Sequence, residues 1–432
     1  KNMFDDYSPI IFKTTDNGKT WTRRDKTFPK NEIIRSIRVD RRDPNILYVG
    51  TETGLYLTLD DGKEWIRVNS NLPIVPVYDI AMKGDSIVLA TNGRSFWILD
   101  DITAIQQLND NHGNDFLLSP APIYRIKPNS SENYIGPMFD SPLGKKYQLA
   151  LGTAAMSEKK KNERGEIITI MLDSGENPPD GVPIYFYIDK DVDGICISIT
   201  DMKGNIIRNF NNMKINSGLN RFIWDMNHNA AIVGIQNAPD GPMALPGKYN
   251  FELKIKRGNI ENSLSTLITL IKDPRTKTSE TDLQEQFDLL NLINSKYSEL
   301  SDNVNVAKIN QAEISEWISR AEANKNYDVI KKAGDKIIDA LNEIENLIGS
   351  AGLGFGVLMS LPEIPLTSKL TGLIPVIDGT DTKPTDQSFG VLEEINERID
   401  EVLEKLRYFQ EVDLIDFQEL VEKHNIPTLK TL

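Results

Sequence analysis

The chain has 432 residues, of which 39% are hydrophobic and 26% charged, a balance typical of a folded protein rather than a disordered one. Its formal net charge is −14 and its pI is about 4.9, which argue against nucleic acid and anionic membrane surfaces as main partners. No stretch approaches the roughly 20 apolar residues of a membrane span. Cys196 is the only cysteine, so an internal disulfide is excluded.

A short pattern is repeated near the N-terminus, and the second copy starts 44 residues after the first. The shared positions are Thr14, Asp16, Gly18 and Trp21 in the first copy and Thr58, Asp60, Gly62 and Trp65 in the second. A period of roughly 40–50 residues is the size of one four-stranded propeller blade. The Asp-x-Gly pattern is typical of hairpin turns, because glycine takes positive φ and the aspartate side chain bonds nearby N–H groups. We therefore expect both aspartates to hold turns rather than to act in catalysis.

The repeated pattern matches the Asp-box of bacterial neuraminidase (BNR) repeats, with Glu64 replacing the threonine in the second copy. A degenerate third copy spans residues 87–101, and within it residues 90–101 resemble the closing blade of bacterial sortilin-like repeat proteins, often described as glycosyl hydrolases. The resemblance continues through the segments 177–181, 218–225, 246–249 and 273–275. It implies the C-terminal part of a longer protein and an extracytoplasmic location, whether periplasmic, cell-surface or secreted.

The sequence thus predicts a multidomain β + α protein. Residues 1–118 are expected to hold the terminal blades of a partial β-propeller, and residues 119–172 an irregular connection with one or two strands. Short strand patterns separated by turns then predict an Ig-like β-sandwich over 173–273, which also resembles the Ig-like module of flagellar hook-capping proteins. The helical period of the remainder predicts an antiparallel helical bundle over 274–432.

Within the predicted bundle, Ser279 is expected to be the N-cap of the first helix. A long loop is expected at 349–385, and it contains the apolar, glycine-rich stretch 352–359. A loop of this length is either functional or packed over its neighbours. Packing against the bundle or propeller and binding of a partner therefore both remain open for this stretch.

One turn of the predicted sandwich is a candidate metal site. Asp189, Asp191 and Asp193, followed by Gly194, match the opening of a calcium-binding loop, in which carboxylates supply hard oxygen ligands. The twelfth position of that loop requires a bidentate acid and is Thr200 here, and both flanks read as strands rather than helices. An acidic hairpin turn is therefore the favoured interpretation, with a calcium site as the alternative.

The sequence contains no compact catalytic pattern. His112, His228 and His424 fall in different predicted domains, and no cofactor motif is present. A glycosidase needs two acids at a defined separation across a cleft, and no such pair can be picked out from 63 acidic residues. No catalytic residue and no cofactor is predicted.

Two functional hypotheses follow. The favoured one is a non-catalytic extracytoplasmic binding or scaffolding protein, which presents a sortilin-like propeller surface to protein or glycan partners. The alternative is a glycoside hydrolase, sialidase- or xyloglucanase-like, whose catalytic carboxylates lie in blades upstream of this chain. In either case two isolated blades would leave sheet edges and apolar faces uncovered. We therefore expect residues 1–118 to pack against further blades from an upstream segment or a partner chain.

Overall fold

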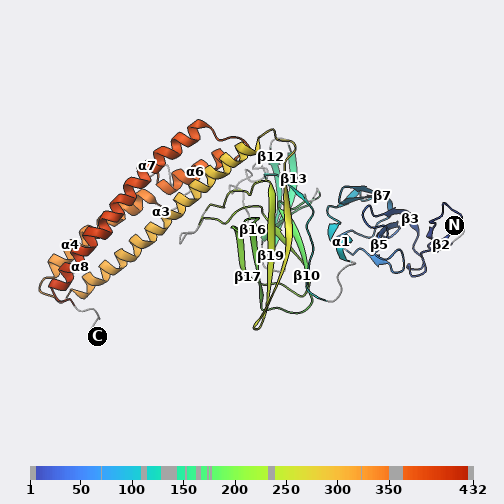
Figure 1. The fold of residues 1–432 in the computed structure, drawn as a ribbon, viewed down its shortest axis with the longest axis horizontal. Coiled ribbons are helices and arrows are strands. Elements are labelled where there is room, and N and C mark those ends of the chain that lie inside the picture. The colour runs from blue at the N-terminus through green and yellow to red at the C-terminus, as the bar shows by residue number, and fades with distance from the viewer. Residues whose placement is uncertain are drawn as a thin grey trace. The chain divides into compact units, whose positions relative to one another are not determined.

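The computed structural model describes residues 6–69, 71–108, 114–127, 144–150, 153–161, 167–172, 175, 178–231, 239–322, 324–349 and 363–426. The chain forms two compact units, each built from separate segments. The first comprises Lys1–Ile123, Ser141–Asp225 and Lys248–Thr269, and the second comprises Tyr124–Asp140, Met226–Gly247 and Leu270–Leu432. Figure 1 labels their helices and strands.

The N-terminal part of the first unit holds a two-stranded, a four-stranded and a three-stranded antiparallel sheet. Their strand orders are β1-β2, β3-β4-β5-β6 and β7-β8-β9, so each sheet is a simple meander. A short helix, α1 (Thr103–Gln107), follows. The strands are β1 (Phe12–Lys13), β2 (Thr22–Arg23), β3 (Ile34–Val39), β4 (Leu47–Thr51), β5 (Leu55–Thr58), β6 (Ile66–Arg67), β7 (Val77–Lys83), β8 (Ser86–Thr91) and β9 (Phe96–Leu99).

The β3–β6 and β7–β9 sheets share one hydrophobic core. Tyr48 and Leu57 from the first sheet meet Ile80, Ile87 and Leu89 from the second, and all five side chains are buried. Alternation along each strand places these residues on one face, as the period of two requires. Each sheet therefore has one face in this core and a second face that the other sheet does not cover.

Residues 119–172 contain more regular structure than the sequence predicts. In place of one or two strands, the segment holds β11 (Ile123–Arg125) and an antiparallel sheet of β12 (Gly144–Ala150), β13 (Thr153–Lys161) and β14 (Ile167–Met171). The central strand, β13, ends in a run of charged residues and lacks the alternation of apolar and polar positions that marks a half-buried strand. The strands of this sheet are therefore paired through their backbones, although the residue pattern of β13 does not predict a strand.

The rest of the first unit is built from two sheets that pack face to face. Their orders are β10-β15-β18 and β11-β20-β19-β16-β17. Aromatic pairs join the layers: Phe222 contacts Phe251 with ring centroids 6.0 Å apart, and Trp224 contacts Tyr249 at 5.4 Å. The strands are β10 (Phe116–Leu117), β15 (Val182–Ile188), β16 (Gly194–Asp201), β17 (Ile206–Met213), β18 (Gly218–Trp224), β19 (Gly247–Arg257) and β20 (Ile260–Lys272). The assignment of these layers to the Ig-like class stays a prediction.

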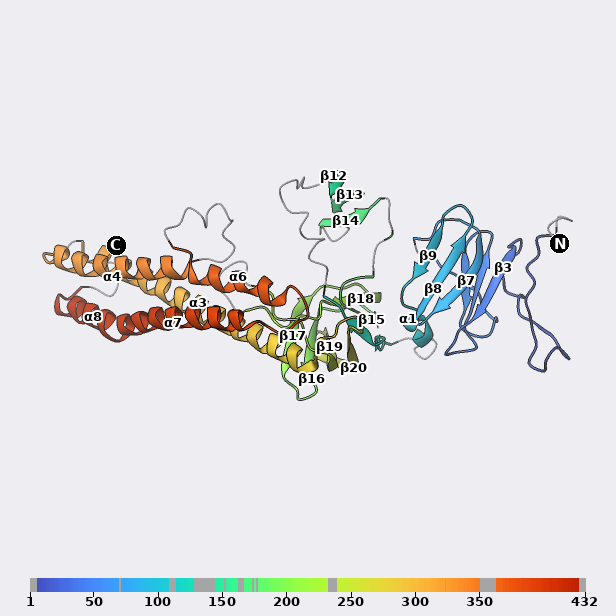
Figure 2. The ribbon, with the colours of Figure 1, turned by 90° about the horizontal axis from the view of Figure 1, so that it is seen from above.

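The second unit contains the helices of the bundle, including α6, which lies within the segment expected to be a loop. They are α3 (Glu280–Arg320), α4 (Tyr327–Ile348), α6 (Leu366–Asp378), α7 (Asp386–Tyr408), a π-helical turn η4 (Phe409–Asp413) and α8 (Leu414–Lys423). Helix α3 runs along the bundle in one direction, α4 and α6 return, and α7 and α8 run in the direction of α3 (Figures 1 and 2). As predicted, Ser279 caps α3, with its hydroxyl accepting from the Asp282 N–H at 3.0 Å. Within the described residues no helix is long and apolar enough to cross a membrane.

The bundle core explains the extent of these helices. Their buried side chains form one continuous apolar cluster, which includes Tyr297, Leu341 and Ile399 with no exposed surface. Buried apolar residues continue along α3 as far as Ile314, and the helix ends at Arg320. The loop expected at 349–385 contains α6, and the stretch 352–359 lies outside the described residues.

Gly50 allows β4 and β7 to approach closely, which gives a test of the core between the two N-terminal sheets. A Cβ at Gly50 would lie 2.5 Å from both the Val77 carbonyl oxygen and the Ser36 hydroxyl. Gly50→Ala is therefore expected to lower the free energy of unfolding of the full chain by about 1–3 kcal/mol, measured by urea denaturation. Gly194→Ala is the control, because its nearest new neighbour is 3.9 Å away. Equal effects of the two substitutions would contradict this packing.

Candidate functional site

The turn of the first repeat, within Thr14–Trp21, is closed by its own side chains; we call it and its second copy the Asp-box turns after the pattern that they resemble. Asp16 Oδ1 accepts hydrogen bonds from the Thr14 hydroxyl at 2.9 Å and the Thr20 N–H at 2.8 Å, and Asp16 Oδ2 accepts one from the Thr20 hydroxyl at 2.7 Å. The Trp21 indole N–H donates to the Gly18 carbonyl at 3.1 Å. Gly18 has a φ of +87°, in the left-handed region that favours glycine. In this geometry the carboxylate is the acceptor around which the turn closes.

The second Asp-box turn has the same geometry. Asp60 Oδ1 accepts from the Thr58 hydroxyl at 2.7 Å and from the N–H groups of Lys63 and Glu64 at 3.0 Å each. Glu64 occupies the position of the usual threonine and contributes its backbone N–H. Gly62 has a φ of +79° and donates its N–H to the Thr58 hydroxyl oxygen at 3.0 Å. The turn therefore tolerates the one departure from the repeated pattern.

The second turn also contacts the first hairpin. The Trp65 indole N–H donates to the Arg24 carbonyl at 2.9 Å, whereas Trp21 bonds within its own turn. The Asp61 carboxylate pairs with Lys13 at 2.7 Å and with Arg24 at 3.0 Å. These polar contacts fix the β1–β2 hairpin against the loop after β5. The second turn thus contacts the preceding hairpin in addition to closing on itself, whereas the hydrogen bonds given above for the first turn lie within that turn.

Apolar side chains of β8 and β9 are exposed on the outer face of the β7–β9 sheet, where Asp79 of β7 lies opposite Ala90. Phe96 is 71% exposed and Ile98 is 59% exposed. In the strand register these residues lie opposite Ala90 and Val88 on β8, so the four side chains share one face. Large exposed apolar patches on a folded protein mark interaction surfaces. We refer to these four residues as the β9 face.

The β3–β6 sheet has a similar surface on its outer side. Ile37 and Val39 are 38% and 54% exposed, and Ile37 pairs with Val49 on β4. Val49 itself is buried beneath Ile11 and Phe28 from the N-terminal hairpin region. The hairpin therefore covers only part of this face. Both outer surfaces of the two-sheet stack present apolar side chains to solvent.

The structure does not gather the three aspartates of the candidate calcium turn. Asp193 accepts a hydrogen bond from the Gly258 N–H at 2.6 Å, which ties the turn to the β19–β20 hairpin. Asp189 and Asp191 do not join it in a cluster. Among the described residues, no group of three His, Cys, Asp or Glu side chains could hold a metal ion. The geometry is that of a hydrogen-bonded acidic turn between β15 and β16.

Arg257 and Asp115, which no sequence motif marks, form an ion pair beside this turn. The Arg257 guanidinium binds the Asp115 carboxylate with distances of 2.6 and 2.8 Å and also donates to the Lys190 and Asp191 carbonyls. Asp115 accepts from the Asp189 N–H at 3.0 Å. The hydrogen bond from Arg257 holds the pKa of Asp115 below its ordinary value. The Arg257–Asp115 pair thus joins the turn between β15 and β16 to the end of β19.

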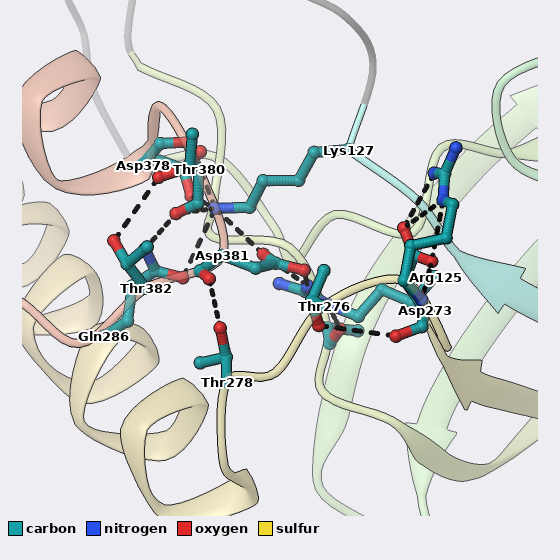
Figure 3. Close-up of polar contacts among 12 residues, drawn as sticks. Arg125, Lys127, Asp273, Thr276, Thr278, Gln286, Asp378, Thr380, Asp381 and Thr382 are labelled. Atoms are coloured by element: carbon teal, nitrogen blue, oxygen red, sulfur yellow. Dashed lines mark hydrogen bonds and ion pairs between the residues drawn. The ribbon is translucent and has the colours of Figure 1, made fainter.

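A buried ionic cluster lies in the second unit (Figure 3). Arg125 Nη1 contacts both oxygens of Asp381 at 2.7 Å, and the two side chains are only 4% and 8% exposed. Arg125 Nε donates to the Ala244 carbonyl at 2.7 Å. Lys127 Nζ pairs with Asp378 at 2.6 Å and with Asp381 at 3.3 Å. The cluster satisfies its buried charges internally, as buried ions require.

The same cluster fixes the loop between α6 and α7. The Gln286 amide on α3 donates to the carbonyls of Ile377 at 2.6 Å and Thr380 at 2.8 Å. The Thr278 hydroxyl donates to the Asp381 carbonyl. Arg125 and Asp381 are far apart in the sequence, so sequence inspection offers no signal for their pairing. The polar groups of this cluster bond to one another and so hold the α6–α7 loop against α3 and β11.

The remaining candidate residues are dispersed among the described residues. The His228 ring packs edge-on against Phe287 at 4.8 Å, and His424 Nδ1 lies 2.9 Å from the Asn326 amide nitrogen. His112 lies outside the described residues. The arginines near β3 each have a different partner, as follows: Arg35 with Glu52, Arg38 with Asp79, Arg41 with the Met82 carbonyl and Arg42 with Asp85.

Comparison with known proteins leaves the family open. No family model matches the chain, and no curated protein matches it. Among solved structures it is similar to an ancestral GH74 enzyme, with 12% sequence identity and a TM-score of 0.18 over 61% of this chain. The match spans 43% of that enzyme's length. A TM-score this low does not establish a common fold, so the sortilin-like and Asp-box resemblance stays a prediction.

The Asp16 carboxyl gives a direct test of the first turn. The hydrogen bond from the Thr20 hydroxyl, supported by the Thr20 N–H, lowers the pKa of Asp16 to about 2. Because this lies below the unfolded value of about 3.9, the contribution of the turn to stability is present above pH 4 and is lost as the pH falls toward 2. Carbon-13 NMR titration should locate this pKa. Thr20→Val should raise it, and Thr22→Val, on a residue that makes no bond to Asp16, should not. An Asp16 pKa near 4 in the unmodified chain would contradict the geometry.

Removing one partner of the buried ionic cluster should be costly. Arg125→Met leaves Asp381 buried with only the more distant Lys127, so we expect a loss of about 3–5 kcal/mol in unfolding free energy by urea denaturation. Arg125→Met combined with Asp381→Leu should cost less than the sum of the two single changes. The control is Arg398→Met, because the Arg398–Glu363 pair is about half exposed and should contribute about 0–1 kcal/mol. Additive losses at Arg125 and Asp381 would refute their coupling.

Proposed function

We propose that this chain belongs to a non-catalytic binding or scaffolding protein in which residues 1–118 are blades of a larger β-propeller. The propeller surface would be presented to protein or glycan partners outside the cytoplasm. The two packed sheets that follow, an Ig-like module in this proposal, and the helical bundle would serve as further modules of the same scaffold. The single observation that carries the proposal is the apolar surface on both outer sides of the N-terminal sheets.

Propeller blades pack face to face, so the strands of each blade bury apolar side chains on both faces. The sheets β3–β6 and β7–β9 are already joined in this way by the core around Tyr48 and Ile80. The β9 face on one side, and Ile37 with Val39 on the other, are the surfaces on which neighbouring blades would sit. We propose that an upstream segment or a partner chain supplies these blades.

The Asp-box turns support the non-catalytic interpretation. The carboxylates of Asp16 and Asp60 are used as acceptors for turn N–H and hydroxyl groups. A general acid or nucleophile must instead present its oxygens to a substrate. In this proposal the two aspartates of the repeated pattern have an architectural role, and ligand recognition is assigned to the surface of the completed propeller.

The β9 face can be tested in the chain itself. The double substitution Phe96→Asp and Ile98→Asp should reduce concentration-dependent association in analytical ultracentrifugation and binding of the apolar dye ANS, because it places charge on the uncovered face. Ile260→Asp is the control, since Ile260 is 65% exposed but lies on β20. If the control lowers association and dye binding as much as the double substitution, the β9 face is not the interaction surface.

The functional part of the proposal is tested on the protein in its natural full length. We expect binding to a protein or glycan array without release of sugar products from oligosaccharide substrates. Hydrolysis of a glycan by the full-length protein, lost on substitution of an acid outside this chain, would favour the glycoside hydrolase alternative and refute the non-catalytic proposal.

A further inference from the structure

A groove lies on the helical bundle between α4 and the end of α7. It encloses about 520 Å³ and continues onto the π-helical turn η4. Helix α4 lines it between residues 340 and 347, and α7 with η4 lines it between residues 401 and 413. The longer wall corresponds to roughly 18 Å of helix, about the length of three helical turns.

The floor of this groove is apolar and continuous with the bundle core. Leu341, Ile344 and Phe409 are buried core residues that line it, and Leu347 is half-buried beside them. Tyr408 also lines the groove and is 59% exposed. Tyrosine supplies a large contact area with one polar end and is enriched among the residues that dominate protein interfaces. The groove can therefore bury apolar side chains of a partner.

The rim carries an uncompensated negative charge. Four carboxylates line the groove, those of Glu343, Glu401, Glu404 and Asp413, against a single ammonium group on Lys405. None of the four forms an ion pair with any residue that the structure describes. By contrast, Glu345 on α4 pairs with Lys308 at 3.1 Å. Charges of one sign around an apolar groove select a partner of the opposite sign.

A second groove on the bundle has a rim whose negative charge is partly neutralised. It encloses about 580 Å³ between α3 and the start of α7 and is lined by Glu285, Asp288 and Glu393 around an apolar floor. Glu285 there pairs with Lys383 at 3.3 Å, so part of its rim charge is neutralised. The groove between α4 and α7 thus combines the larger unpaired charge with the exposed tyrosine.

From these observations we infer that the groove between α4 and α7 binds a basic amphipathic helix of a partner protein. The apolar face of that helix packs on Leu347 and Tyr408, and its lysine or arginine side chains reach the rim carboxylates. This is the helix-in-groove mode of recognition, with anchors at i, i+3, i+4 and i+7. The site is separate from the propeller surface of the proposed function and does not depend on it.

The probe is a fluorescein-labelled peptide of about 14 residues with leucine at i, i+3, i+4 and i+7 and lysine elsewhere. Fluorescence anisotropy with the full chain at about 0.15 M salt, where long-range attraction is screened, should show saturable binding. A peptide with glutamate in place of lysine should not bind. Glu401→Lys with Glu404→Lys should weaken binding of the lysine peptide at least about tenfold, and Tyr408→Ser should weaken it about fivefold or more.

Matched variants separate this groove from the overall charge of the protein. Glu419→Lys with Glu422→Lys changes the net charge equally on exposed positions of α8, and Val376→Ser removes an apolar side chain that is 71% exposed outside the groove. Both controls should leave affinity within about twofold, with helicity of every variant checked by circular dichroism. Absence of saturable binding, or equal losses for the two charge-reversed pairs, would overturn the proposal, because the second result is that of non-specific attraction.

Discussion

A β-sheet with apolar side chains on both faces must be covered on both sides, and the architecture of the N-terminal region follows from this constraint. The sheets β3–β6 and β7–β9 cover one another through the core around Tyr48, Ile80 and Ile87. Their outer faces are left with Phe96, Ile98 and Val39 exposed. Such a stack is extended by further sheets until it closes or meets a polar surface, which is the physical basis for proposing additional blades.

The Asp-box turns serve this stacking. Within each turn the aspartate collects N–H and hydroxyl donors, and the glycine takes the positive φ that the backbone needs. The second turn then reaches the preceding hairpin through Trp65 and Asp61. The second turn is therefore closed by Asp60 and tied to the preceding hairpin by its neighbours Asp61 and Trp65. In the second unit, the buried ion pair between Arg125 and Asp381 holds the α6–α7 loop in place.

Local features could be predicted from the sequence because their causes are local. The Asp-x-Gly turns and the capping residue Ser279 each depend on neighbours in the chain. The sheet β12-β13-β14 was missed because its central strand lacks apolar alternation. Arg257–Asp115 and Arg125–Asp381 were missed because long-range ion pairs leave no periodic signal. The groove between α4 and α7 arises only where two separate helices meet.

Coverage of the β9 face in the native assembly is tested most directly by hydroxyl-radical footprinting of Phe96. The reaction would be compared between this chain alone and the protein in its native assembly, with Met202, 62% exposed, as the internal reference. We predict that Phe96 is modified readily in the isolated chain and strongly protected in the native assembly, while Met202 reacts equally in both. Equal modification of Phe96 in the two samples would show that the face stays open to solvent and would contradict the account.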